Sequence, residues 1–340
     1  MKQFIWKTAL LIFPFFLVFM AYIITDPRKK IYHYDEYTFD YIMLNKGDVS
    51  TKILLNKRDK QHYDSFIFGS SRSCATRSEE WRKYLPPQNV PFSYGSWSES
   101  MEGIYRKIKL LDSLQIPIKN TLIFIDATLT FEKNPEYDPL DSDHYLVSGI
   151  CKFDYYKSDF LEYLRNPKLI ITSVDYYLFK TPRAYMHNFV DPKYGGLNPV
   201  NCDWRTKSEE LIVQDSVNYY NRCKHRFYER SPEQAYAPKS ITKEMEECLL
   251  SIHSIFQKHK TNYKLIINPL YDQIKLNTAD ISVLNDIIGA YHIYDFSGIN
   301  PITNNIYNYN EDVSHYRIKT GDYLLKQVYS DQSFTQTQGK

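Results

Sequence analysis

The 340-residue sequence has little glycine, no paired cysteine spacing and no large excess of either charge. Its 11 glycines form no G-x-G-x-x-G or G-K-[ST] loop, so the common phosphate-binding motifs are excluded. No C-x-x-C or H-E-x-x-H motif occurs, which argues against a zinc ribbon, a thioredoxin-like site and a zinc protease. The sequence has 42 basic and 40 acidic residues, so its net charge is only +2 and a nucleic-acid-binding surface is not expected. We therefore expect no metal, no cofactor and no nucleic-acid partner.

The composition is that of a folded protein, with 43% hydrophobic and 24% charged residues. The 31 tyrosines fit either a sugar-binding surface or half-buried packing positions. Five cysteines leave at least one thiol free or paired with another chain, and one or two disulfides stay open as alternatives in an oxidising compartment.

The amino terminus predicts a membrane anchor. Eighteen residues, 8–25, carry no charge, and as a helix they span about 27 Å, enough for a bilayer core. A cleaved signal peptide is the alternative, but no A-x-A-like site follows Ala21 and the charged DPRKK segment comes next. We expect residues 1–26 to form one uncleaved transmembrane helix in the cytoplasmic membrane, with the rest of the chain extracytoplasmic, in the periplasm.

The remaining sequence alternates apolar strand patterns with amphipathic helix patterns. After a polar linker at 27–62, an α/β domain is predicted at 63–330, with an insertion or cap at about 128–235 and a polar tail at 331–340. Strands are expected at 64–69, 89–95, 120–127, 263–269 and 291–296, and helices at 79–85, 98–115, 240–260, 279–290 and 315–329, with Ser240 as an N-cap. This alternation predicts a doubly wound parallel sheet, whose ligands bind at the carboxyl ends of the strands.

The first strand runs into the polar string Gly69-Ser70-Ser71-Arg72. Glycine allows a sharp turn there, and a serine at the start of the next helix would expose its hydroxyl beside backbone N–H groups that can hold an oxyanion. The alternative is an ordinary polar turn with a serine N-cap. Arg72 is a candidate for binding an anionic acceptor, or for pairing with a nearby carboxylate.

A second polar string precedes the last helix and holds Asp312 and His315. With two residues between them, the carboxylate can reach Nδ1 of the imidazole and leave Nε2 as a base. A surface aspartate that caps a helix is the alternative. Because Ser71 follows the first strand and the pair follows the last, all three are expected at one edge of the sheet.

Together these strings resemble the first and last sequence blocks of the SGNH (GDSL-type) hydrolases and acyltransferases. They are most similar to membrane-anchored members, such as those of teichoic-acid D-alanylation and alginate O-acetylation. The resemblance covers roughly residues 60–130 and 260–330 and implies a flavodoxin-like α/β/α sandwich. It implies that Ser71 is the nucleophile, that Asp312 and His315 complete a triad, and that the N–H groups of Ser71 and Gly95 form the oxyanion hole. Gly103 is the second choice for this glycine.

The resemblance breaks at the third block, where an asparagine is usual and this chain has Asp126 and Thr128. It implies an O-acyltransferase or esterase acting on cell-envelope polysaccharide, with Arg72 and Thr128 touching the substrate and a polytopic membrane protein as partner. A catalytically impaired member that binds glycan or scaffolds a membrane complex is the alternative. His144, among Asp138, Asp141 and Asp143, is expected in a solvated acidic loop rather than a metal site.

Overall fold

The computed structural model describes residues 1–37, 39, 41–132, 143–192 and 195–330. Its centre is a parallel sheet of five strands in the order β2-β1-β3-β6-β7, which confirms the predicted α/β class. The strands are β1 (Ser65–Phe68), β2 (Pro91–Ser93), β3 (Asn120–Ile125), β6 (Asn262–Ile267) and β7 (Ile293–Asp295). β1 and β3 are buried along their whole length, as expected for central strands covered on both faces.

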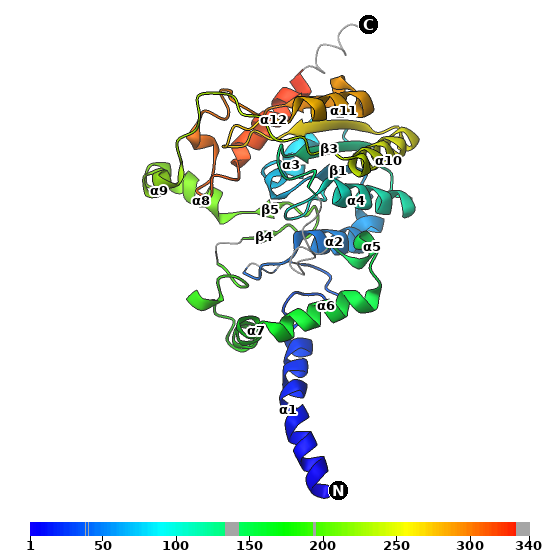
Figure 1. Ribbon diagram of the computed structural model, residues 1–340, viewed down its shortest axis with the longest axis vertical. Helices are drawn as coiled ribbons and strands as arrows, with labels where there is room; N and C mark the ends of the chain where they lie inside the picture. Colours follow the sequence, from blue (N-terminus) through cyan, green and yellow to red (C-terminus); the bar gives the residue numbers. More distant parts are fainter. Residues whose placement is uncertain (38, 40, 133–142, 193–194, 331–340) are drawn as a thin grey trace.

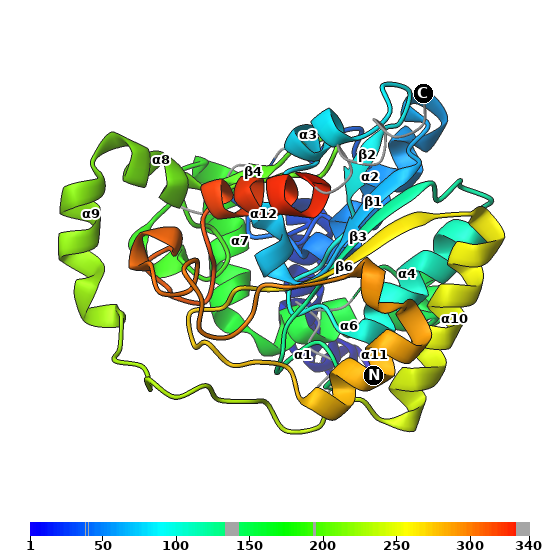
Figure 2. The ribbon, with the colours of Figure 1, turned by 90° about the horizontal axis from the view of Figure 1, so that it is seen from above.

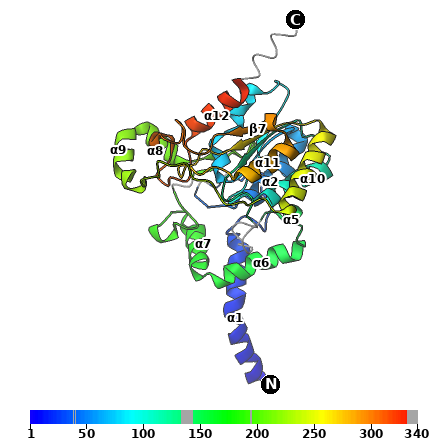
Figure 3. The ribbon, with the colours of Figure 1, turned by 45° about the horizontal axis from the view of Figure 1, so that its top comes forward.

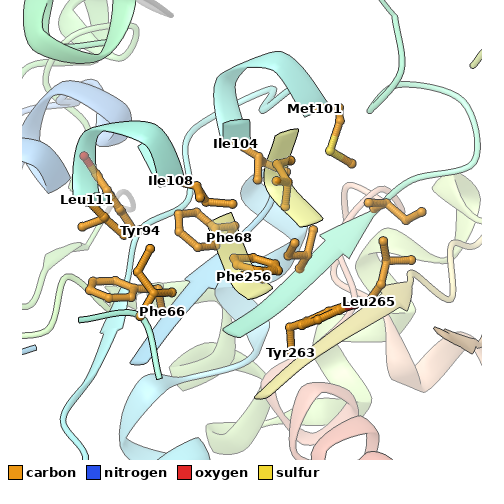
Figure 4. Close-up of a cluster of buried hydrophobic side chains, with 14 of the residues drawn as sticks. Phe66, Phe68, Tyr94, Met101, Ile104, Ile108, Leu111, Phe256, Tyr263 and Leu265 are labelled. Carbon is orange, nitrogen blue, oxygen red and sulfur yellow. The ribbon is translucent and has the colours of Figure 1, made fainter. Parts of the chain in front are cut away.

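Helices cover both faces of the sheet (Figure 2). Alternate side chains point to opposite faces, so Phe66 and Ile123 join one core while Ile67 and Leu122 join the other. The first core is covered by α2 (Lys46–Gln61), α4 (Met101–Ser113), α10 (Lys243–His259) and α11 (Thr278–Ile288). The second is covered by α3 (Ser78–Trp81) and α12 (Ile318–Ser330). Figure 4 shows the α4 side chains lying against the aromatic rings of the strands in the first core.

Several boundaries differ from the sequence prediction, among them those of the linker, α10 and α12. The predicted linker at 27–62 is wrong for residues 46–61, because Val49, Ile53 and Leu54 of α2 are buried in the first core. The N-cap of α10 is Thr242, while the predicted cap, Ser240, donates its backbone N–H and hydroxyl to Asp280. Helix α12 begins at residue 318, which leaves the preceding Asp-x-x-His string in a turn.

The segment between β3 and α10 forms the predicted insertion, and its described residues add no strand to the five-stranded sheet. It holds α5 (Tyr145–Ser148), α6 (Lys152–Arg165), α7 (Pro167–Phe179), the β4–β5 pair (Gly196–Leu197 and Trp204–Arg205), α8 (Lys207–Gln214) and α9 (Ser216–Cys223). Its Asp203 carboxylate accepts the backbone N–H and the hydroxyl of Ser78 at the start of α3. The insertion is therefore joined to the helix that follows the Gly-Ser-Ser-Arg string.

Helix α1 (Lys2–Thr25) extends from one end of the domain (Figure 1). Within it, Trp6–Thr25 is long and apolar enough to cross a membrane. The short 3-10 helices are η1 (Ser71–Ala75), η2 (Arg82–Tyr84), η3 (Ala184–Met186), η4 (Lys224–Arg226), η5 (Ala290–His292) and η6 (Ile306–Asn308).

Candidate active site

The segment after β1 turns sharply at Gly69, whose φ of +143° suits glycine alone. A Cβ atom at this position would lie 2.8 Å from the Cβ of Phe124, so the turn needs a glycine for space as well. Ser70 is the N-cap of η1 and Ser71 is its first residue. Ser71 thus stands at a strand-to-helix turn, where first-turn N–H groups have no acceptor within the helix.

His315 lies next to Ser71, although 244 residues separate the two in the sequence. Its Nε2 atom is 2.7 Å from the Ser71 hydroxyl oxygen, and its Nδ1 atom is 2.8 Å from Oδ2 of Asp312. With Nδ1 donating to the carboxylate, Nε2 accepts the Ser71 O–H. The structure therefore brings the three predicted residues together as a serine, a base and a carboxylate that orients the base.

A tight turn fixes the Asp312 carboxylate. Val313 takes a left-handed φ of +53°, and Oδ1 of Asp312 accepts the backbone N–H groups of Ser314 and His315, each at 3.0 Å. Burial raises the pKa of the Asp312 carboxyl, but the hydrogen bond and charge of His315 and the two backbone donors outweigh it. The net result is a pKa below the ordinary value, so the carboxylate stays ionised beside the imidazole.

Arg72 points to the end of β3 and pairs with the buried Asp126. Its Nη1 atom lies 2.6 Å from Oδ2 of Asp126, and its Nε donates to the Ser314 carbonyl oxygen. Asp126 also accepts the Ser70 hydroxyl at 3.1 Å and the side-chain amide of Asn268 at 2.7 Å. Of the two roles predicted for Arg72, the structure thus has the carboxylate pairing, which balances the charge of Asp126.

Gly95 lies against the same turn. A Cβ at this position would come within 2.5 Å of the Gly69 carbonyl oxygen and 3.0 Å of the Ser73 hydroxyl. Gly103, the second choice, lies inside α4 and packs against Glu99 instead. Thr128 is half-buried in the turn after β3, with no described contact to the serine.

A small cavity of about 20 Å³ opens beside the Ser71 and His315 side chains. The insertion contributes Trp204, Thr206 and Glu209 to its wall, and these residues also border an open groove of about 530 Å³. The insertion therefore forms part of the wall beside the serine.

Sequence reasoning missed two asparagines. Asn268 follows β6 and holds Asp126, and its own side-chain oxygen accepts the hydroxyl of the buried Tyr316 at 2.9 Å. Asn310 lines the cavity, and its Oδ1 is buried with no hydrogen-bond partner among the described residues. Neither belongs to a recognisable motif, but Asn268 directly follows β6, and polar residues at the carboxyl ends of parallel strands are where ligands bind.

His144 is not in a solvated loop, contrary to the prediction. It is buried, its Nδ1 accepts the Leu146 N–H at the start of α5, and its ring packs on Tyr145 and Tyr155. Asp138 and Asp141 lie outside the described residues.

Comparison with protein-family models and with curated proteins finds no match to this chain.

Proposed function

We propose that the protein is a serine acyl-transfer enzyme, an O-acyltransferase or esterase. The observation that carries this proposal is that Ser71, His315 and Asp312 lie within hydrogen-bonding distance, although Ser71 is near the start of the domain's sequence and the other two are near its end. An N-cap serine in an ordinary turn needs no imidazole partner, and a helix-capping aspartate needs no serine. A carboxylate, an imidazole and a hydroxyl in this order are the elements of nucleophilic acyl transfer.

In the first step, the Ser71 hydroxyl oxygen attacks the carbonyl carbon of an ester or thioester while Nε2 of His315 takes the hydroxyl proton. The imidazolium gives that proton to the departing alcohol or thiol, which leaves an acyl group on Ser71. In the second step, His315 takes a proton from water or from a sugar hydroxyl, which attacks the acyl-enzyme. The proton then returns to the serine oxygen, and Asp312 stabilises the imidazolium in both steps.

We further propose an SGNH-like fold for this domain. The strand order β2-β1-β3-β6-β7 supports it, because it equals the 2-1-3-4-5 order of flavodoxin-like sheets when the core strands alone are numbered. The nucleophile after the first strand and the Asp-x-x-His turn before the last helix also fit the SGNH blocks.

The oxyanion hole would differ from the usual SGNH arrangement. The N–H groups of Ser71 and Gly95 are two donors, and the Asn310 side chain is our candidate for the third, because it lines the cavity beside Ser71. Asp126 would not repel an oxyanion as an unpaired carboxylate would, because it forms an ion pair with Arg72 and accepts a hydrogen bond from Asn268.

The size of the cavity favours a small acyl group, and the adjoining groove has room for a larger acceptor. The space of about 20 Å³ next to Ser71 holds little more than one water molecule, so it favours a small acyl group over a long acyl chain. The open groove of about 530 Å³ contains Trp204 together with Glu79, Asn198 and Asp203, a mixture suited to a glycan. We therefore propose cell-envelope polysaccharide as the acceptor.

Location at the membrane follows from α1, whose apolar surface is long enough to cross a bilayer. We propose a single-pass protein of the cytoplasmic membrane with the domain in the periplasm, where a polytopic partner would deliver the acyl group. Retention of α1 is supported by Arg28, just beyond it, which is buried and contacts Asp159 and Glu162.

The test is intact mass spectrometry of the full-length protein in detergent after treatment with a fluorophosphonate probe. Wild type is expected to gain one probe adduct, and Ser71→Ala none. Ser70→Ala is the matched control, because the Ser70 hydroxyl faces Asp126 rather than His315, and it should still react. A folded wild-type protein that does not react would contradict the enzyme proposal.

A second candidate function is favoured by the acidic residue in place of the third-block asparagine. With Asp126 fixed by Arg72, the site can be a catalytically impaired one that binds glycan or scaffolds a membrane acylation complex. Glycan binding by Ser71→Ala that equals wild type, together with no probe adduct on wild type, would favour this function.

A further inference from the structure

Helices α6 and α7 lie across the end of α1 that enters the domain (Figures 1 and 3). The Phe160 ring of α6 packs edge-on against Phe19 of α1, with ring centroids 5.4 Å apart, and also against Tyr22 at 5.1 Å. Val18 of α1 packs in the same cluster as Leu169 of α7. Both helices therefore contact the last two turns of the apolar helix itself, not the chain beyond it.

These contacts set the depth of α6 and α7 relative to a bilayer. The apolar span Trp6–Thr25 has 20 residues, and at about 1.5 Å per residue it covers only about 30 Å, the thickness of a hydrocarbon core. Val18 lies seven residues before Thr25, or about 10 Å below it along the helix axis. Since the whole span is needed to cross, α6 and α7 must lie at the level where headgroups meet acyl chains.

The outer surface of α7 is apolar at this level, whereas the exposed side chains of α6 are mostly charged. On α7, Leu169, Thr172 and Ser173 are buried against the domain. Ile171 and Leu178 are seven residues apart, so they share one side of α7, away from its buried face, and they are 59% and 64% exposed. Phe179 of α7 is 61% exposed as well, and Ile171, Leu178 and Phe179 together are called the collar here.

Charge and tyrosine content at the inner edge of the collar match a lipid surface. Lys29 and Lys180 line a cavity of about 290 Å³ between the end of α1 and α7, together with Tyr176 and Tyr177. The ammonium group of Lys180 lies 4.6 Å from the Tyr177 ring centroid. Tyrosines and basic side chains next to an apolar face are typical of helices that lie in the membrane interface.

We propose that the collar is immersed in the interface of the phospholipid bilayer, so that α7 forms a second membrane contact beside α1. The proposal rests on α1 crossing the membrane and is independent of the chemistry at Ser71. It commits to lipid as the occupant, because the depth set by Val18 and Phe19 places the collar among headgroups whether or not another protein is present.

A buried ion cluster fixes the orientation of α6, and with it the domain, relative to α1. The Asp159 carboxylate of α6 accepts from Arg28 at 2.9 Å and from the Tyr22 hydroxyl at 2.8 Å, and Lys30 lies 3.3 Å away. Since all four side chains are buried, α1 and α6 are held in one relative orientation. An immersed collar then fixes the tilt of the domain on the membrane as well as its attachment.

The test uses the full-length protein in phospholipid nanodiscs, with a nitroxide label on a single introduced cysteine. The accessible native thiols are first removed by Cys151→Ser and Cys248→Ser, because the other three cysteines are buried. Leu178→Cys reports on the collar, Leu11→Cys on α1, and Val213→Cys, 76% exposed on α8, is the water-exposed control. Electron paramagnetic resonance then compares collisions of each label with oxygen, which partitions into lipid, and with a water-soluble nickel complex.

The ratio of oxygen collisions to nickel collisions is expected to be high for the Leu178 label, close to the ratio for the Leu11 label. The Val213 label should instead collide mainly with the nickel complex. A Leu178 label as accessible to nickel as the Val213 label, while the Leu11 label stays in lipid, would overturn the proposal. A Leu178 label that leaves water only when a membrane partner protein is added would also overturn it, in favour of a protein occupant. A Leu11 label that collides freely with the nickel complex would show that α1 does not cross the bilayer, and this would also overturn the proposal. Probe labelling of Ser71 in the same samples keeps the result separate from the proposed enzyme function.

Discussion

Nη1 of Arg72 lies 2.6 Å from Oδ2 of Asp126, so the residue next to the candidate nucleophile holds the acid at the end of β3. Because Nε of Arg72 also donates to the Ser314 carbonyl oxygen, one guanidinium ties the turn after β1 to the turn that carries His315. The ion pair therefore contributes to the geometry between the serine and its base.

Removing Arg72 is expected to be more harmful than removing the whole ion pair. Arg72→Gln leaves the Asp126 carboxylate, which is 1% exposed, without its cation and should lower the free energy of unfolding by about 3–5 kcal/mol. Arg72→Gln combined with Asp126→Asn removes the stranded charge and should recover most of that loss. Urea denaturation in detergent measures both, and a double variant no more stable than Arg72→Gln would contradict the role of the pair.

Asp312→Asn should slow reaction with the fluorophosphonate probe by about 10²–10⁴-fold, because an amide cannot stabilise the imidazolium as the carboxylate does. The rate is followed by intact mass over time. Glu311→Gln is the neighbouring control and should react at the wild-type rate. Similar rates for Asp312→Asn and wild type would show that the turn is structural only.

Asn310→Ala tests the proposed third oxyanion donor. The Oδ1 atom of this side chain has no partner among the described residues, so truncation breaks no hydrogen bond there and should leave the unfolding midpoint unchanged. Loss of one donor should slow the probe reaction by about 10²–10³-fold. The control is Asn308→Ala, because the Asn308 side chain donates to the Ile302 carbonyl oxygen outside the cavity. This variant should lower the unfolding midpoint and leave the rate of the probe reaction unchanged. An unchanged probe rate in Asn310→Ala would argue against the donor role.

His144 should make the domain sensitive to mild acid. Burial lowers the pKa of this imidazole from 6.5 to about 4, so the unfolded chain binds a proton at a higher pH than the folded one. Stability from this group is complete above pH 6.5 and falls as the pH drops towards 4, by up to about 3 kcal/mol. His144→Gln keeps an acceptor for Leu146 and should flatten this dependence in urea titrations at several pH values. Parallel curves for the two proteins would disprove the assignment.

Gly321→Ala should push α12 away from the candidate nucleophile's helix. A Cβ there would lie 2.2 Å from the Ala75 carbonyl oxygen, a backbone atom that cannot rotate aside. The expected cost is about 1–3 kcal/mol, with a slower probe reaction, because η1 carries Ser71. Lys326→Ala, on the exposed side of α12, is the control and should keep wild-type melting and reactivity.

The parallel sheet and the placement of Ser71, Asp312 and His315 could be predicted, because both depend on local patterns and on one topological rule. Helix α2 was missed because its three core residues, Val49, Ile53 and Leu54, stand among lysines, aspartates and an arginine that give the segment a polar composition. The partners of Asp126 could not be predicted, because Arg72, Asn268 and Ser70 meet it only after β1, β3 and β6 pair. Spacing shows which residues lie at one edge of a sheet, but not which charges neutralise each other there.

The insertion between β3 and α10 supplies both the helices packed on the anchor and the wall beside Ser71. Phe160 in its first half contacts Phe19 of α1, and Trp204 and Glu209 further along border the cavity beside Ser71. A single continuous stretch of chain therefore shapes both the contact with α1 and the space beside Ser71. Exchanging that stretch for another sequence would therefore change the packing against α1 and the wall beside Ser71 together, while the five-stranded sheet and the contacts among Ser71, His315 and Asp312 stayed the same.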